Sequence, residues 1–107
     1  TVNSAFDGVG NASSPVTDVY EGVSSEGPNA EHRFGGSDDN DSSGALRYVS
    51  IRHTGRSFAL DKELNSLTMG GVGRGTVIEY MESYASSDDA FEWWGGTVNT
   101  KYLVAAF

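Results

Sequence analysis

Three segments of the chain share a strand-like pattern that is centred on a tyrosine. They are residues 46–51 (LRYVSI), 78–83 (IEYMES) and 100–105 (TKYLVA). The tyrosines of the three copies, Tyr48, Tyr80 and Tyr102, lie 32 and then 22 residues apart. Strands that recur at a spacing in the low twenties are typical of a β-solenoid, in which equivalent strands of successive coils stack on one another. The repeat therefore predicts a ladder of stacked tyrosines.

The rest of the second half also favours strands. Short β-rich runs, separated by glycine- and aspartate-rich breakers, cover residues 46–53, 64–69, 76–84, 90–94 and 98–105. No stretch keeps the apolar spacing of a helix over the ten or so residues that a helix needs. We therefore predict an all-β fold, a parallel β-solenoid with a β-sandwich as the alternative. A second recurring element, an apolar pair followed by a double glycine, occupies residues 67–71 and 93–96.

The alternation of side chains along a strand predicts which residues face the interior. With the tyrosines outside, the inward residues of the three copies are Val49 and Ile51, Met81 and Ser83, and Leu103 and Ala105. Leu46 and Ile78, which are also apolar, reach the same side only if each strand contains a local bulge.

Acidic residues are concentrated in the first part of the chain. Residues 1–44 hold eight acids and one base, whereas residues 45–107 hold seven acids and six bases. We interpret residues 1–44 as an acidic, loop-rich region and residues 45–107 as the β-solenoid coils. The net charge of -8 argues against nucleic acid as a partner and against an anionic membrane surface, and no apolar run is long enough to insert into a membrane.

The absence of cysteine excludes disulfides, thiol catalysis and zinc–thiolate sites. The chain begins at Thr1 and ends on an apolar run, residues 103–107. An exposed strand of this kind tends to pair with another. We expect either self-association or a longer parent chain to cover this C-terminal edge.

The order of several motifs resembles that of secreted or surface-anchored bacterial proteins with a right-handed parallel β-helix, of the kind found in Bacteroidetes and marine bacteria. The motifs are HRFGGSDDNDSSG, GALRYVSIRHTGRS and LNSLTMGGVGRGTVIEYMESYASSDDAFEWWGGTVNTKYLVA, which together cover about residues 32–105. Ala90 replaces a glycine of that pattern and Trp94 a phenylalanine. The resemblance implies the β-helix fold and an extracellular or cell-surface location, and it supplies no activity.

Two acidic turns carry the candidate metal ligands. Calcium prefers hard oxygen ligands, which Asp38, Asp39 and Asp41 offer in one turn and Asp88 and Asp89 in another. The spacing is not that of an EF-hand, and hydrogen-bonded turns account for the same acids without a metal. We expect no required cofactor, and Ca²⁺ is the one ion that these turns suit.

Aromatic and acidic residues near the third repeat suggest a ligand face. Trp93, Trp94 and Glu92 combine aromatic surface with a carboxylate, which suits a polysaccharide. Adjacent tryptophans in a strand face opposite ways, so at most one lies inside. We predict a structural, adhesive or filament-forming protein without enzymatic activity. The alternative is a carbohydrate-binding module or a fragment of a polysaccharide-active β-helix enzyme.

Overall fold

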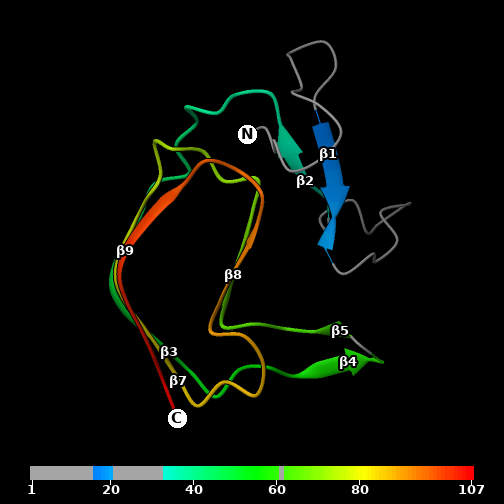
Figure 1. The fold of residues 1–107 in the computed structure, drawn as a ribbon, viewed down its shortest axis with the longest axis vertical. Coiled ribbons are helices and arrows are strands. Elements are labelled where there is room, and N and C mark those ends of the chain that lie inside the picture. The colour runs from blue at the N-terminus through cyan, green and yellow to red at the C-terminus, as the bar shows by residue number, and fades with distance from the viewer. Residues whose placement is uncertain (1–15, 21–32, 61) are drawn as a thin grey trace.

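The computed structural model describes residues 16–20, 33–60 and 62–107, which contain nine β-strands and no α-helix. Within these residues no helix is long and apolar enough to cross a membrane. Most of the strands belong to two full stacked turns of chain, residues 45–76 and 77–98, and residues 99–107 begin a third. We call these the first, middle and third coils, and Figure 1 shows them nearly end-on. The all-β prediction is confirmed for this part of the chain.

Each turn of chain contributes strands to two parallel sheets. The larger sheet has the order β3-β7-β9, built from Ala45–Arg52, Val77–Tyr84 and Asn99–Ala106. The smaller sheet pairs β6, Leu67–Gly70, with β8, Phe91–Trp94. In both sheets the pairing is parallel and joins equivalent positions of successive repeats, whereas a sandwich would pair its strands antiparallel. Because the stack has only two turns, the sheets are small and no described strand closes either end.

The first turn is longer because it contains a hairpin. β4, Ser57–Ala59, pairs antiparallel with β5, Lys62–Glu63, and the hairpin projects from the stack in Figure 1. The sequence pattern did not predict these two strands. They account for the unequal tyrosine spacing of 32 and 22 residues, since the second turn has no such insertion.

Two more strands precede the coils. β1, Val16–Val19, pairs antiparallel with β2, Arg33–Gly36, beside the smaller sheet. Both strands lie within residues 1–44, which the sequence predicts to be an acidic, loop-rich region, and much of that range lies outside the described residues. The boundary near residue 44 therefore stays a prediction.

The three tyrosines of the repeat adopt a left-handed backbone conformation, and this explains the interior of the coils. Their φ angles are 55° to 56°, which is unusual for a bulky residue. The strand kinks there and resumes with its alternation shifted, so that Ile78 faces inward together with Met81 and Ser83. The local bulge that an inward-facing Ile78 requires therefore lies at the tyrosine itself.

The core is centred on the middle coil. Met69, Ile78 and Met81 are its buried members, with exposed fractions of 3% or less. Partly buried residues from all three coils pack against them, among them Val49, Ile51, Leu67, Phe91 and Leu103. Ala105 lies in register with the buried Ser83, as the inward prediction requires, yet it is exposed because no described strand covers β9 on its far side.

The two double glycines are offset by one residue in the smaller sheet. Gly70 lies opposite Trp94 in the β6–β8 register, not opposite Gly95. A side chain at Gly70 would collide with the Tyr20 ring and would come within 2.7 Å of Phe34 Cγ. Gly70 therefore leaves room for aromatic rings from the N-terminal strands, which is a packing role and not a repeated turn.

Buried hydroxyl groups occupy the corner between the two sheets. Ser83, 1% exposed, shares a hydrogen bond of 2.7 Å with Ser66, and Thr54 contacts Ser66 at 2.6 Å and Ser86 at 3.0 Å. Polar side chains inside a core are tolerated when they satisfy one another in this way.

Candidate functional site

The first acidic turn is tied to the coils by hydrogen bonds. The Asp39 carbonyl accepts bonds from the backbone N–H of Arg74, at 2.9 Å, and from the Thr97 hydroxyl, at 2.7 Å. The Asp39 carboxylate lies 3.8 Å from the Arg74 guanidinium. Asp38 accepts a bond of 2.9 Å from the Asn40 backbone, and the Asp41 carbonyl accepts the Gly75 N–H at 3.1 Å. These contacts serve to fasten the turn onto the corner before β7.

The second acidic pair lies in the corner before β8, not inside a strand. Asp88 and Asp89 are exposed, and the Asp89 carbonyl accepts the Ser66 backbone N–H at 3.0 Å. In the part of the chain that the structure describes, no three His, Cys, Asp or Glu side chains are placed to hold one metal ion. Calcium binding by either turn stays a prediction.

The two adjacent tryptophans have opposite environments. Trp94 faces outward and lies against the N-terminal strands, with ring centroids 6.0 Å from Phe34 and 6.3 Å from Tyr20. Trp93 lies in register with the buried Met69, yet it remains 45% exposed because β8 is the last strand of its sheet. The predicted face of Trp93, Trp94 and Glu92 is therefore split between the two sides of the sheet.

Glu92 belongs to a polar group on the same outer side as Trp94. Its carboxylate accepts hydrogen bonds from the Asn65 amide and, at 3.3 Å, from the Thr68 hydroxyl of the preceding coil. Burial raises the pKa of the nearby Tyr20 above its usual 10.0; a hydrogen bond with the Gly70 backbone opposes this shift, and the negative charge of Glu92 adds to it. Asp88 and Asp89 have no part in this group.

The three tyrosines form one stacked column on the outer side of the larger sheet, as their repeat predicts. The ring centroids of Tyr48 and Tyr80 are 4.8 Å apart at 9°, and those of Tyr80 and Tyr102 are 4.6 Å apart at 20°. This spacing matches the separation of neighbouring strands. The inner ring faces cover one another, so between the two end rings the column presents ring edges to solvent, and one face each of Tyr48 and Tyr102 stays open.

Charged side chains run beside the tyrosine column. Arg47, Glu79 and Lys101 occupy equivalent positions of β3, β7 and β9, and Arg47 Nε lies 3.2 Å from Glu79 Oε2. Lys101 has no ion partner among the described residues. The order of charges along the stack is therefore positive, negative, positive.

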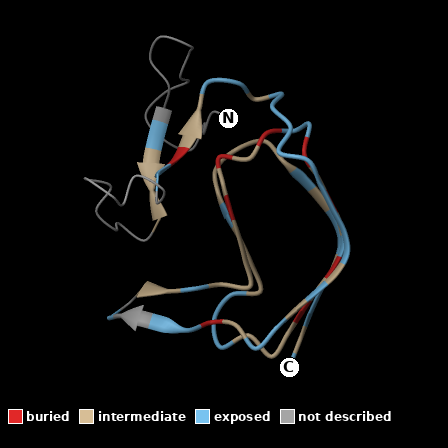
Figure 2. Cartoon of the chain, turned by 180° about the vertical axis from the view of Figure 1, so that it is seen from behind, coloured by how far each residue is buried: buried red, intermediate tan, exposed pale blue. Residues whose placement is uncertain are grey.

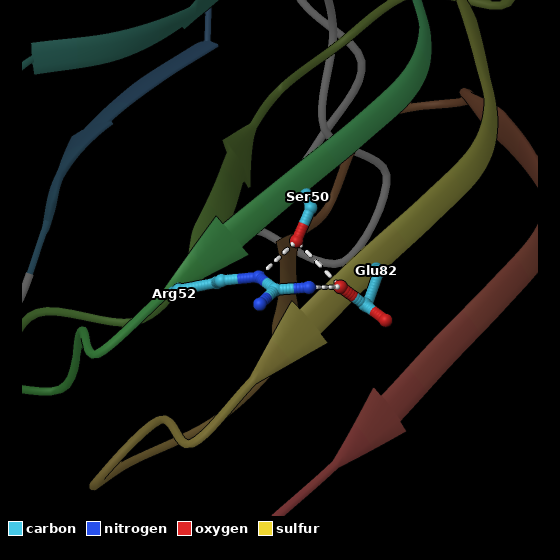
Figure 3. Close-up of polar contacts among 3 residues, drawn as sticks. All are labelled: Ser50, Arg52 and Glu82. Carbon is cyan, nitrogen blue, oxygen red and sulfur yellow. Dashed lines mark hydrogen bonds and ion pairs between the residues drawn. The ribbon is translucent and has the colours of Figure 1, made fainter.

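A second charged group lies on the other flank of the column. Figure 3 shows Glu82 accepting hydrogen bonds from Ser50 and from the Arg52 guanidinium, at 2.5 Å and 2.9 Å. These two donors hold the pKa of Glu82 below its usual value near 4.5. The Arg52 guanidinium also lies 5.2 Å from the centre of the Tyr84 ring. The equivalent residues of β9, Val104 and Ala106, carry no charge.

β9 is the open edge of the larger sheet among the described strands. It pairs with β7 on one side, and no described strand lies on its other side. Tyr102 and Val104 are 63% and 54% exposed along this edge, and Trp93 is similarly open at the end of the smaller sheet. Aromatic and apolar surface combined with unpaired backbone groups is what a further strand would cover.

Comparison with known families identifies this stack of coils. The model of the pectate-lyase-like β-helix domain matches residues 9–107, which is nearly the whole chain. The chain therefore belongs to this β-helix family. No curated protein and no solved structure matches the chain significantly.

Proposed function

We propose that this protein is an extracellular or cell-surface β-solenoid of the right-handed parallel type, with a structural or adhesive role. In this role further coils add to the open edge of β9, and the protein carries out no catalysis. Family membership and the motifs shared with secreted β-helix proteins support the fold type and the location. The observation that carries the role is the aromatic and apolar edge formed by Trp93, Tyr102 and Val104.

The arrangement of the described side chains supports a role without catalysis. The acids of the two turns lie apart from Glu92, and the donors around Glu92 are an amide and a hydroxyl. Both faces of Tyr80 and the inner faces of Tyr48 and Tyr102 are covered by neighbouring rings. What the coils do present is an edge, and in solenoids each added coil stabilises the stack through its nearest-neighbour interface.

A grafted coil tests this role. Residues 86–107, which span one turn without the hairpin, are appended a second time after Phe107, with Lys101→Gln in the appended copy so that the residue placed beside the native Lys101 is uncharged. We call this version the neutral graft because it is uncharged at that one position. If β9 takes up coils, the extended chain unfolds in one transition at a higher denaturant concentration than the original chain.

The matched control carries the same appended segment with Trp93→Ser and Leu103→Ser in the appended copy only. These changes remove the apolar residues that would face the core, so the midpoint should return to that of the original chain. An equal midpoint for the original chain and the neutral graft would contradict the proposal.

The polar group on the outer side of β8 favours a second candidate, a carbohydrate-binding face. Trp94 Nε1 and Asn65 Oδ1 are buried without hydrogen-bond partners, and Glu92, two residues before Trp94 in β8, accepts a hydrogen bond from the Asn65 amide. A sugar hydroxyl could satisfy such groups. For this to happen, the Tyr20 and Phe34 rings over Trp94 must move aside.

Titration with acidic and neutral polysaccharides, followed by Trp fluorescence in a Trp93→Phe background, examines this candidate. Binding at this face predicts a change in Trp94 emission that Glu92→Gln weakens. Release of new reducing ends during the titration would contradict the proposed lack of catalysis.

A further inference from the structure

The charges at the two ends of the stack have the same sign. Arg47 of β3 is at one end of its column and Lys101 of β9 at the other, while Glu79 of β7 lies between them. The Arg47 side chain is 48% exposed and is paired to Glu79 on its inner side. Lys101 is exposed and has no ion partner among the described residues. Each end of the column therefore presents a cation to whatever strand comes next.

The aromatic column ends in the same open way. Tyr80, which has a ring on either side, is 43% exposed, whereas the end members Tyr48 and Tyr102 are 78% and 63% exposed. The difference arises because each end ring has one uncovered face. A flat ring placed one strand spacing beyond Tyr102 would continue the stack.

These observations constrain the strand that fits beside β9. A residue next to Lys101 should be acidic, since opposite charges directly across a pair of strands stabilise it and like charges destabilise it. The next residue should be aromatic, to cover Tyr102, and the third apolar, to lie beside Leu103. Glu79, Tyr80 and Met81 of the middle coil show this pattern within the protein.

We infer that the β9 edge is a docking surface for a parallel strand of a partner coil that carries acidic, aromatic and apolar residues at three successive positions. A second copy of this chain fits less well, because stacking in register would place Arg47 of the copy beside Lys101. The inference rests on the proposed function, since it assumes that coils add at this edge, and it names the partner's chemistry.

The test uses the extended chain of the preceding subsection. Three versions differ at one position of the appended coil: Lys101 is kept, or replaced as Lys101→Gln or as Lys101→Glu, and the native Lys101 in β9 is unchanged. The unfolding equilibrium constant should fall about 1.5- to 5-fold from the Lys to the Gln version, and by a similar factor from Gln to Glu. Near 1 M salt, where surface charges are screened, the three should converge.

A fourth version distinguishes the effect of the residue placed beside the native Lys101 from the effect of net charge. It carries Lys101→Gln together with Asn99→Glu in the appended coil, which gives it the same charge as the Glu version. Its added carboxylate lies beside the uncharged Asn99 of β9, so its stability should stay close to that of the Gln version. Stability equal to that of the Glu version would overturn the inference.

The outcomes also separate this inference from the proposed function. If the neutral graft gives no stabilisation, the proposed function fails before charge is considered. If the neutral graft stabilises the chain but the Lys version is as stable as the Glu version, the edge accepts its own cationic strand and this inference is overturned.

Discussion

The middle coil and the two outer coils carry the same repeat, but their burial differs. Ile78 and Met81 of β7 are 3% and 1% exposed, whereas Leu46 of β3, the equivalent of Ile78, is 42% exposed. Within the coils, the buried residues lie mainly on β7 and in the turn before it, and Figure 2 colours the buried residues red on the stacked coils. The difference comes from neighbours, since β7 has a strand on each side and the outer strands have one.

Equivalent residues of the repeat are therefore buried to different extents, depending on where their strand lies in the stack. Leu103 of β9 occupies the position of Met81, yet it is only partly buried. In a solenoid the stability of each coil is set by its nearest neighbours, so the outer coils should contribute less per residue than the middle one.

The largest effect is expected when the equivalent inward-facing side chain is shortened in two different coils. Met81→Ala should lower the free energy of unfolding by roughly 2–5 kcal/mol, because it leaves a cavity that packed neighbours on both sides cannot fill. Leu103→Ala should cost roughly half as much, since solvent already reaches that side chain. Urea denaturation measures both. Equal losses would mean that β9 is covered as fully as β7.

Much of this arrangement could be predicted because the repeat encodes it. The tyrosine spacing aligned three strands that do pair in parallel, and it predicted the ring column. The left-handed tyrosines could not be foreseen from propensity, because a bulky residue seldom adopts positive φ. A signal was present, since Ile78 and Met81 are three residues apart, and one face of a regular strand cannot hold both.

The candidate site was less predictable. The predicted ligand face groups Trp93, Trp94 and Glu92 because they are adjacent in sequence. Alternation of side chains along β8 places Trp93 on the opposite side of the sheet from Trp94 and Glu92. Tyr20 and Phe34 lie far from Trp94 in sequence, and their contact depends on the space above Gly70. The open edge depends on which strands lie beside β9, and a local sequence pattern does not specify those neighbours.

The Tyr20 and Phe34 rings that lie against Trp94 provide a second test of how packed and open regions differ. Gly70→Ala would force the Tyr20 and Phe34 rings away, at a cost of about 1–3 kcal/mol if they cannot adjust. In a Trp93→Phe background we expect stronger acrylamide quenching of Trp94. The same background with Gly70 intact is the control. Unchanged quenching would show that the N-terminal strands do not shield Trp94.

The smallest expected effect concerns Glu82, whose partners come from the first coil and have no counterpart in the third. The Ser50 and Arg52 donors lower its pKa in the folded protein, so the unfolded chain takes up a proton first as the pH falls. The stabilisation from Glu82 should be complete above the usual value near 4.5 and be lost as the pH drops through the lowered pKa. Glu82→Gln should remove this part of the acid dependence, and Arg52→Gln should weaken it. Urea midpoints at pH 7 and at acidic pH measure the difference. If the Glu82→Gln variant kept the original acid dependence, the Ser50 and Arg52 contacts would not stabilise the Glu82 carboxylate in the folded protein.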